Sequence, residues 1–126
     1  MFNRIDYTMI MVSDMARSVR FYRDVLGFRL RFESEFWTEF DTDGTTLALH
    51  GGARPRQGGA ALAEDKPAGT VAIGLNVSNL DATVQMLKGQ DVPFLMEPTL
   101  REGEGIRLAV FADPDGLPIS LSQAVR

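Results

Sequence analysis

The sequence VSDMARSV at residues 12–19 returns as VSNLDATV at residues 77–84, an offset of 65 positions. A second block, DTDGTTLAL at residues 41–49, returns as DPDGLPISL at residues 113–121, an offset of 72 positions. Two matched blocks in the same order indicate an internal repeat, which constrains architecture more firmly than local propensity does. The chain is therefore predicted to contain two copies of one structural unit.

The first copy is predicted to form a βαβββ module. Ser13 or Asp14 offers a side-chain oxygen to cap a helix, and Gly27 is placed to end that helix with a positive φ. The helix carries one apolar stripe, formed by Met15, Val19, Tyr22 and Leu26. The sequence DTDG at residues 41–44 predicts a tight turn between the last two strands. Strands are expected at residues 5–12, 28–33, 36–41 and 45–50.

The second copy repeats this plan, which makes the chain α+β. Its helix is expected at residues 80–88, with a stripe of Leu80, Val84 and Leu87, and DPDG at residues 113–116 predicts its final turn. Strands are expected at residues 70–77, 92–96, 106–112 and 117–122. We expect one domain over residues 1–126, made of module one (4–50), a Gly-, Ala- and Pro-rich linker (51–69) and module two (70–123); a lid is the alternative role for the linker.

Several motifs within this repeat resemble those of the vicinal oxygen chelate superfamily, also called glyoxalase/bleomycin resistance/dioxygenase proteins. They are VSDM at residues 12–15, FY at 21–22, VLGF at 25–28 and FADPDG at 111–116. The resemblance covers nearly the whole chain. It implies that two tandem βαβββ modules form a curled mixed sheet around a concave pocket, and that two chains form a homodimer. The resemblance identifies a fold better than an activity.

The same resemblance locates the positions at which metal-using members hold their ion. Those members take one His, Gln or Glu ligand from the first strand and one from the last strand of each module. Here the positions fall on Tyr7, Ala48, Ala72 and Ser120. Two alanines supply no donor, Tyr7 and Ser120 are weak ligands, and His50, the only histidine, cannot hold a metal alone. We therefore predict no metal site and no cofactor.

Strand alternation sorts the residues of the predicted sheets into two faces, because side chains at i and i+2 point the same way. The face under the helices is predicted to carry Thr8, Ile10, Val12, Leu47, Leu49, Val71, Ile73, Leu75, Val77, Ile119 and Leu121. The concave face is predicted to carry Tyr7, Met9, Met11, Ala48, His50, Ala72, Gly74, Asn76, Ser120 and Ser122. The second set mixes small, polar and flexible residues, which is typical of a ligand cavity.

Two residues outside those strands join the candidate ligand site. Trp37 is placed to stack on a planar or cationic ligand, with core or interface packing as the alternative. Arg107 is placed to pair with an anionic ligand, with Glu97 or Glu102 as the alternative partner. His50 is a weak catalytic candidate, and a solvent-edge residue is its alternative role. The predicted ligand-binding set is Tyr7, Met9, Trp37, Ala48, His50, Asn76, Arg107, Ser120 and Ser122.

Composition excludes several other functions. The formal net charge of −4 and the pI near 4.9 argue against nucleic acid as a partner. No apolar run approaches the roughly 20 residues that a membrane span needs. The absence of cysteine excludes disulfides and thiolate ligands, and the N-terminal residues do not resemble a secretory leader, so we expect a cytoplasmic protein.

These observations favour a metal-free member of the superfamily that binds a small, partly apolar organic molecule, with a toxin or an antibiotic as the candidate ligand. The alternative is a glyoxalase-like lyase or dioxygenase with a non-standard metal site built from Tyr7, His50 and an acidic residue of a partner chain. A cofactorless enzyme that uses His50 as a base is the third hypothesis.

Overall fold

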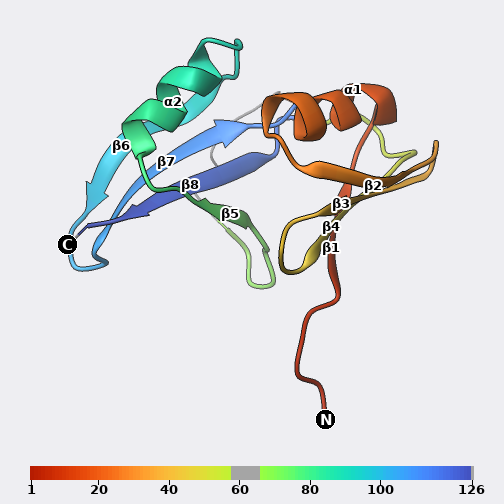
Figure 1. Ribbon diagram of the computed structural model, residues 1–126, viewed down its shortest axis with the longest axis horizontal. Coiled ribbons are helices and arrows are strands. Elements are labelled where there is room, and N and C mark those ends of the chain that lie inside the picture. Colours follow the sequence, from red (N-terminus) through yellow and green to blue (C-terminus); the bar gives the residue numbers. More distant parts are fainter. Residues whose placement is uncertain (58–65, 126) are drawn as a thin grey trace. The chain divides into compact units, whose positions relative to one another are not determined.

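The computed structural model describes residues 1–57 and 66–125 and divides the chain into two compact units, Met1–Gln57 and Gly58–Arg126. Each unit contains one four-stranded mixed sheet with a helix on it (Figure 1). The division falls within the predicted linker, of which residues 58–65 lie outside the described part of the chain. The predicted α+β arrangement of two tandem βαβββ modules is therefore confirmed.

Module one is a sheet in the order β1-β4-β3-β2, with β1 parallel to β4 and the other pairs antiparallel. Its elements are β1 (Tyr7–Met11), α1 (Met15–Arg20), η1 (Phe21–Val25), β2 (Arg29–Glu33), β3 (Trp37–Asp41) and β4 (Thr46–His50). Each strand starts within two residues of its predicted start. Residues beyond the predicted end at 50 still belong to this module, because the Ala53 N–H donates to the Val12 carbonyl at 3.2 Å.

The helix of module one begins and ends as its sequence indicates. Asp14 is the capping residue, and its carboxylate accepts a hydrogen bond from the Arg17 N–H at 3.1 Å. The last turn widens into a π-helix, in which the Leu26 N–H donates to the Phe21 carbonyl at 3.0 Å. Gly27 follows with a φ of +82°, the conformation predicted for the residue that ends this helix.

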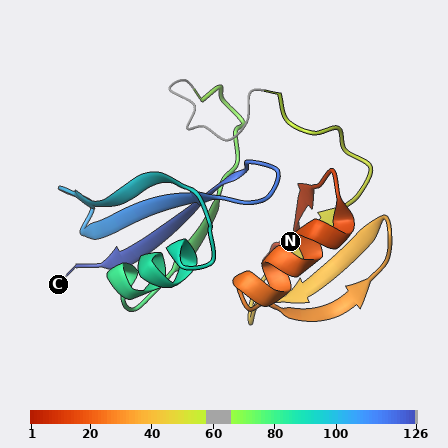
Figure 2. The same cartoon turned by 90° about the horizontal axis from the view of Figure 1, so that it is seen from above.

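Module two is a sheet in the order β5-β8-β7-β6. Its elements are β5 (Ile73–Asn76), α2 (Leu80–Lys88), β6 (Phe94–Arg101), β7 (Ile106–Ala112) and β8 (Pro118–Ala124). The bounds of α2 agree with the predicted helix. In contrast, β5 is shorter than the predicted strand at residues 70–77, because its pairing with β8 begins only at Ile73. Figure 2 shows each helix lying across its own sheet.

The repeat extends to individual hydrogen bonds. Asn79 caps α2 with φ and ψ of −139° and 95°, close to the −141° and 99° of Asp14. The Val12 N–H donates to the His50 carbonyl at 2.9 Å, and the Val77 N–H donates to the Ser122 carbonyl at the same distance. The second strand of each module also carries a bulge at the same point, between Leu30 and Phe32 in β2 and between Phe94 and Met96 in β6. These shared details support two copies of one backbone plan.

The core of each module lies between its helix and one face of its sheet. The predicted faces are largely confirmed: Val12, Leu49 and Ile119 are fully buried, and Leu121 is nearly so. Val71 was misplaced, because it precedes β5 and is 78% exposed. Two hydroxyl groups in module one, of Ser18 and Thr38, are buried without a hydrogen-bond partner among the described residues. In the described ranges, no helix has the length and apolar character needed to span a membrane.

Candidate functional site

The face of module one that is turned away from α1 gathers most of the predicted site residues. Cross-strand register places Met9, Ala48 and Glu39 in one row over β1, β4 and β3. Met11 and Trp37 flank His50 in the row beside it. We call this surface the aromatic face and define it as Tyr7, Met9, Met11, Trp37 and His50. Tyr7, Met9 and Met11 are 50%, 43% and 48% exposed, so a patch of apolar and aromatic surface is open here.

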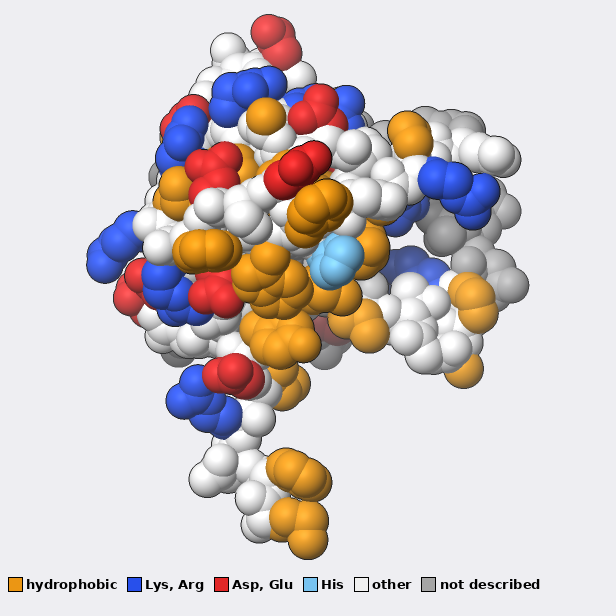
Figure 3. Space-filling view, turned by 90° about the vertical axis from the view of Figure 1, so that its right-hand side faces the viewer, with side chains coloured by type: hydrophobic (Ala, Val, Ile, Leu, Met, Phe, Trp, Pro, Cys, Tyr) orange, Lys and Arg blue, Asp and Glu red, His pale blue; other side chains and the backbone are white. Residues whose placement is uncertain are grey.

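Figure 3 shows this arrangement as a surface: the single histidine lies beside a cluster of hydrophobic side chains, while charged side chains lie mostly around the cluster. Two phenylalanines of the same module, Phe32 and Phe36, are also exposed. Phe32 lies opposite Glu39 in the sheet, so it extends the aromatic face toward β2. An apolar centre with charged groups around it is typical of a surface that binds another molecule.

Two rings of the aromatic face meet across a strand. Tyr7 lies opposite Thr46 and Trp37 lies opposite His50, so Ala48 is midway between them on β4. The strands β1 and β3 are about 10 Å apart, twice the usual strand spacing. The ring centroids of Tyr7 and Trp37 are nevertheless only 5.6 Å apart, in an edge-to-face arrangement. The rings therefore close over Ala48, which is fully buried although it is on the open face.

The indole of Trp37 is held from its polar edge. Its Nε1–H donates to Glu39 Oε2 at 2.8 Å, and Arg31 donates to Glu39 Oε1 from Nε at 3.1 Å and from Nη2 at 2.9 Å. The hydrogen bond from Trp37, and after it the one from Arg31, lowers the pKa of the Glu39 carboxyl group. Glu39 therefore remains charged and fixes the indole near neutral pH.

Arg31 joins three strands of the module. Besides Glu39 on β3, its guanidinium donates to Asp41 Oδ1 at 2.6 Å and to Thr46 Oγ1 on β4 at 2.9 Å. Hydrogen bonds to these carboxylates raise the pKa of the guanidinium, so its charge is permanent. Because the planar guanidinium donates to three side chains at once, these hydrogen bonds restrict the rotamers of Arg31 and of its partners. The aromatic face is thus held in place by contacts within module one.

His50 lies next to Trp37 at the end of β4, and it is partly buried. The two rings are nearly perpendicular, with centroids 6.2 Å apart. The His50 Nδ1 atom is 2.7 Å from the carbonyl oxygen of Gly51. His50 therefore has a fixed ring orientation and lies on the aromatic face, the face of the sheet on which strand alternation placed it.

The corresponding face of module two differs in its side chains. By the sheet register, Leu108 takes the position of Trp37, Val110 that of Glu39 and Ser122 that of His50. Gly74 lies opposite Ser120, as Met9 lies opposite Ala48 in module one. Asn76 is exposed, and Ser120 and Ser122 are partly buried. Among the described residues of module two, this face offers hydroxyl and amide groups beside the aliphatic side chains of Leu108 and Val110.

The four positions that resemble metal-ligand positions do not fit a metal ion. Ala48 has no donor and is buried under Tyr7 and Trp37, and Ala72 also has none. Ser120 and Tyr7 supply only hydroxyl groups. Among residues 1–57 and 66–125, no group of three or more His, Asp or Glu side chains is placed to hold a metal. No chemical step through a metal is therefore derived from this arrangement.

Within module two, the structure places Arg107 on the opposite face of the sheet from the predicted site residues Ser120 and Ser122. It lies opposite Gln123 on β7, on the face that carries Ala109 and Leu121 under α2. Its Nη1 and Nη2 donate to the two carboxylate oxygens of Asp81, both at 3.0 Å. This bidentate pair lowers the pKa of Asp81 and raises that of Arg107. The proposed partners Glu97 and Glu102 were therefore wrong, and Arg107 is removed from the ligand site.

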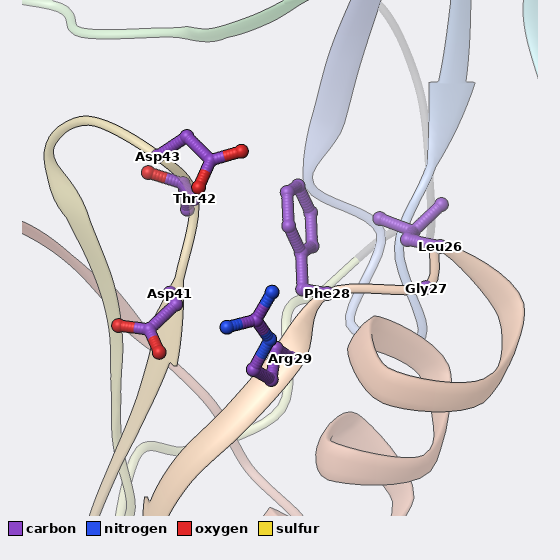
Figure 4. Close-up of a pocket in the computed structure, with 7 residues that line it drawn as sticks. All are labelled: Leu26, Gly27, Phe28, Arg29, Asp41, Thr42 and Asp43. Carbon is purple, nitrogen blue, oxygen red and sulfur yellow. The ribbon is translucent and has the colours of Figure 1, made fainter.

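A separate depression of about 320 Å³ lies where the helical segment of module one passes into β2 (Figure 4). In the close-up, the turn after β3 forms one wall, and Phe28 and Arg29 lie on the other side. Asp41 in this depression is already bound by Arg31. The lining residues are Leu26, Gly27, Phe28, Arg29, Asp41, Thr42 and Asp43. Sequence reasoning identified the turn at residues 41–44 but no site there.

Sequence reasoning also missed the two charged residues that organise the aromatic face. Glu39 is two positions after Trp37 on β3, so alternation alone indicates that they share a face. Arg31 is harder to place, because the bulge between Leu30 and Phe32 interrupts the alternation of β2. The sequence did contain one signal for Glu39, because a charged residue stands two positions after an aromatic one on the same predicted strand.

Comparisons with known proteins agree with this architecture. A family model described as the glyoxalase/bleomycin resistance protein/dioxygenase superfamily matches residues 4–121. A protein of Vibrio cholerae named "Probable lactoylglutathione lyase" is 34% identical, over 96% of this chain and 91% of its own length. The uncharacterised protein YaeR of Escherichia coli is 31% identical, over 94% of each chain.

The structural likeness extends over the same length. The crystal structure of a glyoxalase/bleomycin resistance protein/dioxygenase from Nocardioides covers 100% of this chain and 86% of its own, with a TM-score of 0.77 at 18% identity. This likeness shows the fold. The family match and the two relatives show more: this chain belongs to the glyoxalase/bleomycin resistance protein/dioxygenase superfamily.

Proposed function

We propose that this chain binds a small, flat, partly apolar organic molecule on the aromatic face of module one, without a metal ion at the superfamily's ligand positions. The observation that carries this proposal is the contact of Tyr7 with Trp37 over Ala48. This contact covers one of the two metal positions of module one with aromatic surface. A ring surface in place of a ligand set favours stacking and apolar contact over coordination.

The aromatic face has the properties that such binding requires. Trp37 is fixed by Glu39 and Arg31, so little conformational freedom is lost when a ligand packs on it. Met9 and Met11 are unbranched and exposed, and such side chains adapt to irregular ligand shapes. The predicted polar contacts Asn76, Ser120 and Ser122 belong to module two and are not part of the site proposed on module one. A toxin or an antibiotic with a planar ring system is our proposed ligand class.

The test uses the fact that Trp37 is the only tryptophan in the chain. A panel of planar aromatic compounds, toxins and antibiotics is titrated while the emission of Trp37 and the melting temperature are recorded. We expect saturable quenching and a higher melting temperature with at least one compound. The matched control is Trp37→Leu, which carries the residue of module two at the same position and should lose the thermal shift. A panel that changes neither signal in the wild-type protein counts against the proposal.

A second candidate function is supported by the relative from Vibrio cholerae, whose name describes a probable lactoylglutathione lyase. For this chain to act as such a lyase or as a dioxygenase, a metal would have to be held by Tyr7, His50 and an acidic residue of a partner chain. A lactoylglutathione lyase assay with and without added Ni²⁺ and Zn²⁺ tests this alternative. Turnover that depends on the added ion and is lost in His50→Ala would favour the enzyme over the binding protein.

We also propose that the chain forms a homodimer. Within the described residues, β1 pairs only with β4 and β5 pairs only with β8, so each strand has one edge open to pairing with another chain. Two-fold dimers are the commonest assemblies of chains of this kind. Light scattering at micromolar concentration should give twice the chain mass of 13.9 kDa, and a mass of one chain would contradict the dimer.

A further inference from the structure

We infer that His50 determines the specificity of this site: its Nε2 atom accepts a hydrogen bond from the ligand, so the site takes flat aromatic molecules that carry a hydroxyl or N–H group. The inference rests on the proposed function, because it requires a ligand on the aromatic face. It adds a chemical class to that ligand. Four observations about His50 carry it, and each is independent of any metal.

The first observation identifies which ring nitrogen of His50 carries the proton. Nδ1 is 2.7 Å from the carbonyl oxygen of Gly51, and a carbonyl oxygen can only accept a hydrogen bond. Nδ1 must therefore be the donor. In the neutral imidazole only one nitrogen carries hydrogen, so Nε2 has a free lone pair and is an acceptor.

The second observation is that the carbonyl group that binds Nδ1 is itself fixed. Gly51 is buried, and its N–H donates to the carbonyl oxygen of Phe36 at 3.1 Å. A side chain at this position would bring its Cβ within 2.6 Å of the Glu35 carbonyl oxygen, so only glycine fits without a backbone shift. The His50 carbonyl is held as well, by the Val12 N–H at 2.9 Å. The backbone on both sides of the imidazole therefore has little freedom to turn the ring.

The third observation concerns the neighbours of the His50 ring on the aromatic face. His50 lies in register with Met11 of β1 and with Trp37 of β3, and its ring is at 88° to the indole. Both neighbours in that row are apolar except at the indole N–H, which Glu39 already binds. The imidazole is therefore the polar group in a row of otherwise apolar contact surface.

The fourth observation concerns the remaining nitrogen. Across the described ranges 1–57 and 66–125, the structure gives Nε2 no hydrogen-bond partner, and Nδ1 is the ring atom in contact. A ligand that covers this row removes water from Nε2, and an acceptor left unpaired by a ligand weakens binding. A donor on the ligand restores the lost hydrogen bond. The site therefore distinguishes a ring with a hydroxyl or N–H group from the same ring without one.

The proton position can be measured directly, because the chain contains one histidine. Long-range ¹H–¹⁵N spectra of the labelled protein above pH 7.5 should show the Nδ1–H tautomer, with Nε2 unprotonated. The control is a glycine substitution that leaves His50 and its neighbours unchanged. Gly74→Ala in module two is suitable because no atom lies within 4 Å of the added Cβ, whereas Gly52→Ala would strain a backbone with a φ of +89°. The spectrum of Gly74→Ala should show the same tautomer. An Nε2–H tautomer in the wild-type protein would overturn the inference.

The ligand class is tested with two probes that differ in one donor, 2-naphthol and 2-methoxynaphthalene. Binding is followed on the indole N–H resonance of Trp37, which is a single peak in this chain. We expect 2-naphthol to bind about tenfold more tightly to the wild-type protein. In His50→Phe a ring is kept but no acceptor replaces Nε2, so the two probes should bind equally. His50→Leu removes the ring and the acceptor together and should give the same result.

The outcomes separate this inference from the proposed function. Equal binding of both probes to the wild-type protein would overturn the role of His50 and leave the proposed function intact. A preference for 2-naphthol that persists in both His50→Phe and His50→Leu would also overturn that role, because the donor would be recognised elsewhere. If neither probe shifts the Trp37 resonance at millimolar concentration, the proposed function itself fails.

Discussion

The two modules share a backbone plan but present different exposed faces. Phe40 and Phe111 take equivalent buried positions opposite Leu47 and Ile119, and both are fully buried. On the other face, module one carries an aromatic pair held by charged groups, and module two carries small, aliphatic and hydroxyl side chains. Packing against the helix therefore restricts one face of each sheet, while the other face is free to differ. A functional difference between the two modules is therefore expected on this exposed face.

The fixed backbone beside His50 is expected to give the largest effect on stability. Gly51→Ala places a Cβ 2.6 Å from the Glu35 carbonyl oxygen, so the strand end must shift. We expect a loss of about 2 kcal/mol in the free energy of unfolding, measured by urea denaturation. The control in module two is Gly74→Ala, where no atom lies within 4 Å of the added Cβ. Equal losses in the two variants would show that the strand end of module one is not specially constrained.

Replacing Trp37 by the residue at the equivalent position of module two tests whether the aromatic face of module one is the face that binds a ligand. Trp37→Leu gives module one the residue that Leu108 supplies in module two, and it removes the contact with Tyr7. We expect the affinity for a flat aromatic ligand to fall at least tenfold, about 1.4 kcal/mol, by calorimetric titration. Ser122→Ala in module two should change it by less than a factor of two or three. A larger loss in Ser122→Ala would move the site to module two.

The buried faces also differ in polarity where Thr38 of module one is equivalent to Ala109 of module two. Thr38 is fully buried, and its hydroxyl has no partner among the described residues. Thr38→Val keeps the shape and removes the unpaired hydroxyl, so we expect the free energy of unfolding to rise by up to about 1 kcal/mol. Thermal denaturation at one pH measures this change. A clear decrease in melting temperature would mean that the hydroxyl is hydrogen-bonded in solution.

Glu39 is expected to give the smallest effect, visible only in acid. The pKa of its carboxyl group is lowered in the folded protein, first by Trp37 and then by Arg31, so the ionised form stabilises the fold above the unfolded pKa of about 4.3. This stabilisation is lost as the pH falls below that value. We expect the wild-type protein to lose more stability between pH 5.5 and pH 3 than Glu39→Gln does. Parallel pH profiles would show that the carboxylate is not held in this way.

Much of the fold was predictable because the repeat and the strong local signals agree. The helix at residues 80–88 and the end of the first helix at Gly27 follow from periodicity and glycine conformation alone. The faces of β1 and β4 follow from alternation. In each of these cases, a few neighbouring residues specify the structure.

The features that could not be predicted depend on register between strands. The pairing of Arg107 with Asp81 joins β7 to α2, and the pairing of Arg31 with Glu39 crosses a bulge. The contact of Tyr7 with Trp37 needs the position of both strands relative to Ala48. None of these distances can be obtained from the spacing of residues along the chain. The faces of the strands could therefore be predicted from the sequence, but the contacts between their side chains could not.

The central claim is that this member of the superfamily has aromatic surface in place of metal ligands. The most direct test is the metal content of the purified protein by mass spectrometry, together with melting curves in added Ni²⁺, Zn²⁺, Mn²⁺ and Fe²⁺. A true site at 100 times its dissociation constant would stabilise the fold by about 2.7 kcal/mol, which raises the melting temperature by several degrees. We predict no stoichiometric metal and no such rise. One metal ion per chain, or a clear rise with one of these ions, would contradict the account.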